Sequence, residues 1–129
     1  MTNMRLLLSC FAACVAAVTL ASAAAASCVP STPAQQRARA TVIFDGVALE
    51  SGPTSTGVQR FRVTRYLKGS GPRIVRVNTG HVRRADGIVT VTSVSLLVKR
   101  NERWRIFARG SAEKVLQSNV CAGSRKLPR

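Results

Sequence analysis

The sequence predicts an all-β domain, a small barrel of five short strands preceded by one short helix. Apolar and polar residues alternate along several short runs, as in strands that are buried on one face only. Clusters of Gly, Pro, Asn and Ser separate these runs. Short strands with glycine-rich breaks favour a barrel over a parallel sheet, which needs helices between its strands.

Residues 1–27 are typical of an export signal that is removed. Arg5 supplies the charged start, an apolar run covers residues 6–20, and small residues fill 21–27. We therefore expect a secreted, extracellular protein. The apolar run of about 15 residues is short for a membrane anchor, which needs about 20.

The exact processing of this segment leaves alternatives open. Cleavage after Ala23, Ala26 or Ser27 fits the preference for small residues. A lipoprotein that begins at Cys14 or Cys28 is a second alternative, and an uncleaved anchor is a third.

Two of the four cysteines, Cys10 and Cys14, lie in the expected signal. Cys28 and Cys121 bracket nearly the whole of the remaining chain. In an oxidising compartment these two residues have one intramolecular pairing open to them, so we expect a disulfide.

The mature chain is expected to be one small and strongly basic domain, residues 28–125, followed by a loose basic tail, residues 126–129. Loss of residues 1–27 removes one of the 20 basic residues and none of the five acidic ones, which leaves a net charge of +14. Such a surface attracts anionic partners, and salt weakens their binding.

The first half of the domain predicts a helix and two strands. Residues 33–40 predict a short helix with Pro33 in its first turn. Residues 41–49 predict a strand that Gly46 interrupts with a bulge or a close approach of two backbones. Residues 58–66 predict a second strand, half buried because its apolar and polar residues alternate.

The second half predicts three more strands. Residues 74–77 form a run with Val75 and Val77 facing inward. Residues 88–98 are rich in β-branched residues, and we expect Val89, Val91 and Val94 to supply core. After a turn at 101–103, we expect a last strand with one face made by Trp104, Ile106 and Ala108.

Several motifs together resemble netrin-like modules, in particular bacterial relatives of the tissue inhibitors of metalloproteinases. The motifs are Cys28-Val29-Pro30, Pro33-Ala34-Gln35-Gln36, Ala40-Thr41-Val42-Ile43-Phe44-Asp45-Gly46-Val47, Phe61-Arg62-Val63, Tyr66-Leu67-Lys68-Gly69, Asn101-Glu102-Arg103-Trp104-Arg105-Ile106-Phe107-Ala108 and Val120-Cys121-Ala122-Gly123-Ser124.

The resemblance covers nearly all of residues 28–125 and implies a five-stranded OB-type barrel, closed or partly open, that is exported and held by one disulfide. In those inhibitors, the amino group and carbonyl of an N-terminal cysteine chelate the zinc of the target protease. The resemblance therefore implies a possible inhibitory N-terminus at Cys28, which requires cleavage directly after Ser27.

Binding through a cationic surface is the function that we expect from the residues themselves. An anionic polymer, a membrane surface or an extracellular protein would suit this surface as a partner, and a protease remains an alternative. Nucleic acid is not favoured, because bases need aromatic platforms and only Phe107 shares a strand face with arginines. The expected basic surface comprises Arg60, Arg62, Arg65, Arg83, Arg84, Lys99, Arg100, Arg103, Arg105 and Arg109.

We expect neither catalysis nor a cofactor. No serine lies in a nucleophile-elbow context, and the single histidine, His81, lies in a basic excursion bounded by glycines, where we expect it to be solvated. One histidine and two oxidised cysteines do not make a zinc site.

Overall fold

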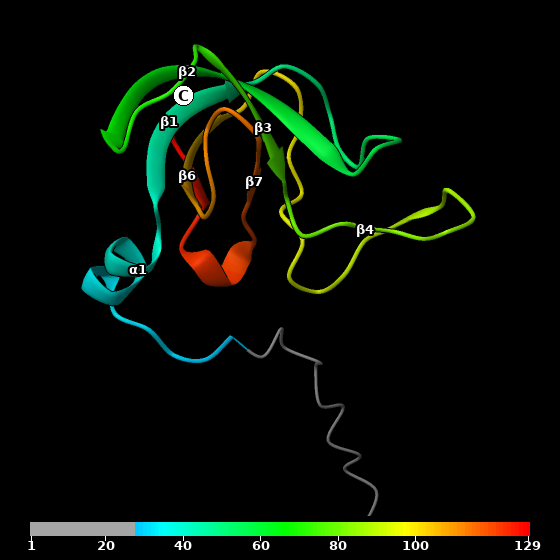
Figure 1. The fold of residues 1–129 in the computed structure, drawn as a ribbon, viewed down its shortest axis with the longest axis horizontal. Helices are drawn as coiled ribbons and strands as arrows, with labels where there is room; N and C mark the ends of the chain where they lie inside the picture. Colours follow the sequence, from blue (N-terminus) through cyan, green and yellow to red (C-terminus); the bar gives the residue numbers. More distant parts are fainter. Residues whose placement is uncertain (1–27) are drawn as a thin grey trace, which may run out of the picture.

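The computed structural model describes residues 28–129, in which one strongly curled sheet carries most of the chain (Figure 1). The predicted signal, residues 1–27, lies outside the described residues. The elements are α1 (Pro33–Arg39), β1 (Val42–Ala48), β2 (Val58–Lys68), β3 (Ile74–Asn78), β4 (Val82–Arg83), β5 (Val89–Thr90), β6 (Arg103–Ala108), β7 (Val115–Gln117), the 3-10 helix η1 (Val120–Ala122) and β8 (Arg125–Lys126).

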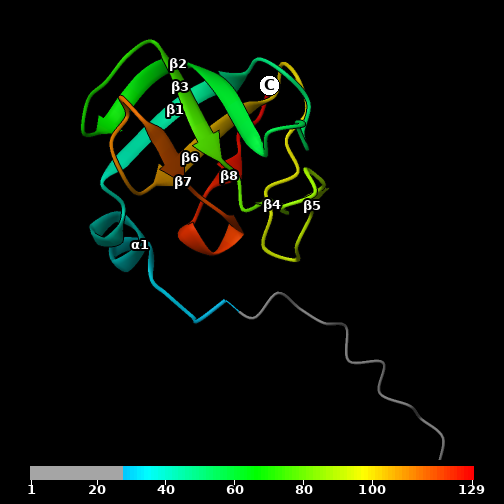
Figure 2. The ribbon, with the colours of Figure 1, turned by 45° about the vertical axis from the view of Figure 1, so that its right-hand side comes forward.

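Six strands form the main sheet, in the order β7-β3-β2-β1-β6-β8, and β4 pairs with β5 in a separate hairpin. Neighbours in the main sheet are antiparallel except β3 and β7, which run parallel. The sheet curls into a half-barrel (Figures 1 and 2), and a bridge between Arg109 and Gln117 links the chain after β6 to β7. The mostly β architecture and the short helix are confirmed, but the sheet is not a closed barrel.

Helix α1 begins as its sequence predicts. Thr32 caps it, because its hydroxyl accepts a hydrogen bond from the Gln35 N–H at 3.2 Å while the Gln35 side chain accepts one from the Thr32 N–H at 2.9 Å. Two side chains then tie the helix to the sheet. Lys68 Nζ donates to the carbonyl of Arg37 at 2.8 Å, and Arg109 Nε donates to the carbonyl of Arg39 at 3.1 Å.

The main core fills the inside of the curled sheet. Val75, Val77, Trp104, Ile106 and Ala108 face it, as the alternation of their strands predicts. A second, smaller cluster lies on the outer side of β1 and β6, where Ala40, Ile43 and Phe107 are buried with Leu67 and Ala122 packed against them.

Gly46 allows the close approach that its position in β1 predicts. A Cβ at this residue would lie 3.0 Å from the carbonyl oxygen of Arg62 and 3.0 Å from the Phe44 ring. The pairing of β1 with β2 also shifts register between Asp45 and Gly46. A side chain here would therefore push β1 and β2 apart.

The expected strand over residues 88–98 is wrong in most of its length. Only Val89–Thr90 pairs, with β4. Val91 is exposed, Val89 and Val94 are half-buried and outside both core clusters, and Leu96 and Val98 supply the buried side chains instead. The reason is a local turn: the Thr92 N–H donates to the Ser95 hydroxyl at 2.9 Å, and the Ser95 N–H donates to the Thr92 carbonyl at 3.1 Å. These hydrogen bonds replace those of a strand.

The tail expected to be loose from residue 126 is held at its start. Lys126 belongs to β8, which pairs with Trp104 and Arg105 of β6 through Lys126 and Arg125. The Leu127 N–H donates to the carbonyl of Arg103 at 2.8 Å, so the pairing continues one residue further. This short strand covers the outer edge of β6.

Candidate functional site

The outer, convex face of the sheet gathers arginines from four strands, β2, β3, β6 and β8. Cross-strand pairing places paired side chains on the same face, about 5 Å apart. Arg60 of β2 pairs with Arg76 of β3. In a second row, Val47 of β1 pairs with Arg62 of β2 on one side and with Arg103 of β6 on the other. In a third row, Asp45 of β1 lies between Arg65 of β2 and Arg105 of β6, and Arg105 pairs in turn with Arg125 of β8. We call this set the arginine face; it consists of Arg60, Arg62, Arg65, Arg76, Arg103, Arg105 and Arg125.

A buried carboxylate orders two of these arginines. Asp45 is 4 % exposed and lies between Arg65 and Arg105. Arg105 donates Nε to Oδ1 at 2.7 Å and Nη2 to Oδ2 at 2.9 Å, and Arg65 Nη2 donates to Oδ2 at 3.1 Å. The Arg105 hydrogen bonds, followed by those of Arg65, lower the pKa of Asp45 despite the opposing effect of burial. The group therefore stays ionised and holds both guanidinium groups in place.

A shallow cleft of about 480 Å³ lies at the β2–β3 end of the face. Glu50 holds Arg60 there, accepting from its Nη2 at 2.9 Å and its Nε at 3.0 Å. Arg76 points from the neighbouring strand and makes no ion pair within residues 28–129. Thr54, Thr56 and Val58 complete the lining, and the Thr54 hydroxyl already donates to the Val58 carbonyl at 2.7 Å. The cleft therefore combines a guanidinium that Glu50 fixes with an unpaired one.

Charge on this surface is far from balanced. Asp45, Glu50, Asp86 and Glu102 each pair with a basic side chain, and together they engage five of the 19 basic residues in the described range. Fourteen basic residues are left without an acidic partner there. Four of them, Arg62, Arg76, Arg103 and Arg125, belong to the arginine face.

The structure brings together five of the ten expected basic residues, Arg60, Arg62, Arg65, Arg103 and Arg105. The others lie elsewhere: Arg83 and Arg84 belong to the β4–β5 hairpin, which projects from the sheet (Figures 1 and 2), Lys99 and Arg100 lie in the turn before β6, and Arg109 follows β6.

Sequence reasoning missed Arg76 and Arg125. Arg76 could have been found, because it alternates with the buried Val75 and Val77 and must face outward. Arg125 could not, because no pattern marks the two-residue strand β8.

Phe107 does not offer an exposed aromatic platform. It shares the outer side of β6 with Arg105, as expected, but it is only 6 % exposed. Ala40, which follows α1, and Ile43 of β1 pack against the ring, and the Arg125 guanidinium lies 6.0 Å from its centroid. The expectation that Phe107 is free to stack is therefore wrong.

His81 is likewise buried rather than solvated, at 4 % exposure. Its Nδ1 lies 2.7 Å from the Thr79 hydroxyl, while its Nε2 is buried with no hydrogen-bond partner in residues 28–129. Burial lowers the pKa of His81. The Leu96 N–H donates to the carbonyl of Thr79 at 2.8 Å, and this hydrogen bond holds the segment around Leu96 beside Thr79.

Cys28 and Cys121 form the expected disulfide, with their Cα atoms 5.2 Å apart at a sequence separation of 93. The bond joins the chain before α1 to η1. Asn119 caps η1, since its Oδ1 accepts from the N–H groups of Cys121 and Ala122 at 2.9 and 3.1 Å.

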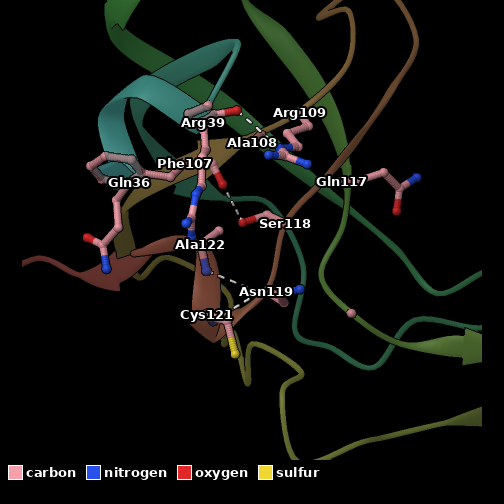
Figure 3. Close-up of a pocket in the computed structure, with 12 residues that line it drawn as sticks. Gln36, Arg39, Phe107, Ala108, Arg109, Gln117, Ser118, Asn119, Cys121 and Ala122 are labelled. Atoms are coloured by element: carbon pink, nitrogen blue, oxygen red, sulfur yellow. Dashed lines mark hydrogen bonds between the residues drawn. The ribbon is translucent and has the colours of Figure 1, made fainter. Parts of the chain in front are cut away.

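A pocket of about 360 Å³ lies between α1, the end of β6 and η1 (Figure 3). Arg39 and Arg109 lie at one end of it and Asn119 and Cys121 at the other. Its remaining lining residues are Gln36, Ala40, Gly80, Phe107, Ala108, Gln117, Ser118 and Ala122.

Among residues 28–129, no three His, Cys, Asp or Glu side chains cluster in a way that could hold a metal ion. Neither helix described there has the length and apolar character that crossing a membrane requires. No family model, curated protein or solved structure matches the chain.

Proposed function

We propose that the chain is an exported, non-catalytic binding module that holds a linear anionic polymer of the cell envelope or extracellular space on its arginine face. The observation that carries this proposal is the arrangement of seven arginines in three adjacent rows, with only Asp45 and Glu50 to balance them. Guanidinium groups bind phosphate, sulfate and carboxylate in bidentate fashion, so repeated rows suit a chain of such groups.

The cleft at the β2–β3 end would be the anchoring point for one anionic group. Glu50 fixes Arg60 in a single orientation, which reduces the entropy lost on binding. Arg76 supplies the second guanidinium, and its charge is not shared with any acid in the described chain. The Thr54 hydroxyl already donates to the Val58 carbonyl at 2.7 Å, so the two guanidinium groups are the donors that the cleft offers.

The aromatic residues favour a saccharide or phosphate polymer over nucleic acid. Phe44, Phe61, Trp104 and Phe107 are all buried, and the half-buried Tyr66 packs against the main core, so no aromatic ring of the described chain stands free for a base to stack on. Charge without stacking platforms suits polymers whose anionic groups lie on a non-aromatic backbone.

An OB-type, netrin-like fold and export belong to the same proposal. The first three strands form an antiparallel meander, β6 pairs with β1, and β7 pairs in parallel with β3. This order is compatible with a partly open five-stranded barrel to which β8 adds an edge strand. The Cys28–Cys121 disulfide fits an oxidising compartment.

The test is binding of a fluorescent heparin oligosaccharide, a model sulfated polymer, by the mature protein at salt concentrations between about 50 and 200 mM. The variant R62Q/R76Q/R103Q should bind heparin about tenfold or more weakly. The slope of its log affinity against log salt concentration should be shallower by roughly one unit for each lost contact. The matched control is R37Q/K114Q/R129Q, which loses the same charge at exposed positions off the face.

Two results would contradict the proposal. Equal weakening in both triple variants would show that net charge alone attracts the polymer. Affinity that does not change with salt would show that the arginines are not the contacts.

Metalloprotease inhibition through Cys28 is the second candidate. The observation that favours it is the position of Cys28, which the disulfide fixes beside η1 while Val29 next to it is 76 % exposed. Sequencing of the exported protein decides the matter, because any first residue other than Cys28 would block chelation by its amino group.

A further inference from the structure

We propose that the pocket between α1, the end of β6 and η1 binds a small amphiphilic anion: a carboxylate or phosphate carried on a short apolar body. This site is separate from the cleft at the β2–β3 end of the arginine face and does not depend on polymer binding.

The charge at the pocket selects an anion. Arg39 and Arg109 line one end, and none of the five acidic residues of the described chain lines any part of it. Arg109 Nε donates to the carbonyl of Arg39 at 3.1 Å, which holds that guanidinium at the pocket while its Nη groups stay unbonded within residues 28–129. Two guanidinium groups at one end can share a single carboxylate or phosphate.

The neutral polar groups point to the same chemistry. Asn119 uses its Oδ1 to cap η1, so the amide group left for a ligand is a donor. The Ser118 hydroxyl is already engaged, at 2.7 Å from both the Phe107 carbonyl oxygen and the Ser124 hydroxyl. The hydrogen-bonding capacity that remains is therefore richer in donors than in acceptors, which suits an acceptor-rich head group.

Apart from the amide side chains of Gln36 and Gln117, the rest of the lining is largely apolar. Ala40, Phe107, Ala108 and Ala122 contribute only hydrocarbon and aromatic side chains. A volume of about 360 Å³ lies near the lower end of ordinary small-molecule pockets, roughly 300 to 1,000 Å³. This size fits a short acyl or aryl body with one head group.

The test uses four probes: octanoate, octyl phosphate, octanol and acetate. Titration of the mature, disulfide-bonded protein, followed by amide NMR shifts, should show both amphiphilic anions binding about tenfold or more tightly than octanol or acetate, with shifts at Gly80, Asn119 and Ala122. Comparing octanoate with octyl phosphate shows which head group the two arginines prefer.

Variants separate this site from general charge. R39Q/R109Q should weaken octanoate binding by about tenfold or more while heparin binding on the arginine face stays within about twofold. R83Q/R84Q loses the same charge on the β4–β5 hairpin and should bind octanoate as the unaltered protein does. Ala122→Leu should also weaken octanoate binding, by filling the pocket.

The proposal is overturned if octanol binds as tightly as octanoate, if R83Q/R84Q loses as much affinity as R39Q/R109Q, or if neither anion shifts the pocket amides. Arg39 and Arg109 are both exposed, so their substitution leaves the core intact, and the Lys68 hydrogen bond to Arg37 still ties α1 to the sheet when that of Arg109 is lost. Circular dichroism of each variant checks the fold independently.

Discussion

Arg105 donates a hydrogen bond to each carboxylate oxygen of Asp45, a residue 60 positions earlier, at 2.7 and 2.9 Å. The pair spans β1 and β6 at the centre of the arginine face. One carboxylate thus makes it possible to place two guanidinium groups side by side, since Arg65 binds the same group from β2.

Asp45→Asn should destabilise the protein by about 2 kcal/mol, because it removes charge-assisted hydrogen bonds from a buried group and leaves Arg105 without a counter-ion. Urea denaturation measures the change. The matched control is Asp86→Asn, which breaks an exposed ion pair to Arg84 and should change stability by less than about 1 kcal/mol. Similar losses in the two variants would show that burial of Asp45 contributes nothing.

Glu102 should dominate the loss of stability in acid. Burial alone would raise its pKa, but hydrogen bonds from the Lys99 N–H, Lys126 and Trp104 lower the pKa to about 2. Because the pKa of Glu102 is lower in the folded than in the unfolded protein, its ionised form stabilises the fold. This contribution is fully present above pH 4.5, the ordinary pKa of the group, and is lost as the pH falls toward 2.

The measurement is the free energy of unfolding of Glu102→Gln between pH 2 and 7. The variant should be less stable than the unaltered protein at pH 7, on the order of 2 kcal/mol, and should depend less on pH in the acid range. Glu113→Gln, at an exposed position without an ion pair in the described chain, should follow the unaltered protein. Parallel acid profiles for all three proteins would contradict the assignment.

His81 should make stability fall as the pH drops below about 6.5, its ordinary pKa. Burial lowers its folded pKa, so the unfolded chain takes up a proton more readily and protonation favours unfolding. His81→Asn keeps a partner for the Thr79 hydroxyl and should abolish this part of the pH dependence. Denaturation midpoints at pH 5, 6 and 7 measure it, and an unchanged slope in the variant would rule out His81 as the titrating group.

Removal of the disulfide by C28S/C121S should cost about 4 kcal/mol, since the bond closes a loop of 93 residues. Thermal denaturation with and without reductant measures the effect. Reductant should lower the melting temperature of the unaltered protein and leave that of the double variant unchanged. A melting temperature that is the same for both proteins would show that the bond does not stabilise the fold.

Strand alternation gave reliable predictions where one face of a strand packs on the main core. Arg60 and Arg62 were expected to face outward because Phe61 and Val63 face inward, and both expectations are confirmed. Alternation says which face a residue shares but not what covers that face. Phe107 was misjudged for this reason, because residues as far apart in the sequence as Ala40 and Ala122 pack around it on the outer side of β6.

The other wrong predictions concern loops, whose folding the sequence pattern does not reveal. His81 is buried because residues 92–96 fold back over it, where the Ser95 hydroxyl donates to the carbonyl of Gly80 at 3.0 Å. Composition predicted a strand there, yet Thr92 and Ser95 bond to each other instead. The pocket beside η1 had no sequence signal at all, because it is assembled from α1, β6 and a helical turn that the disulfide holds in place.

The direct pairing of Arg60 with Arg76 places like charges opposite each other on neighbouring strands, and Glu50 offsets only that of Arg60; such pairing weakens a sheet. The free protein should therefore carry electrostatic strain that an anionic partner relieves, and binding should raise the melting temperature most at low ionic strength. Arg76→Gln should melt higher than the unaltered protein when no polymer is present and gain less when heparin is added. Recognition and resistance to heat would then be opposing demands on a single pair of side chains.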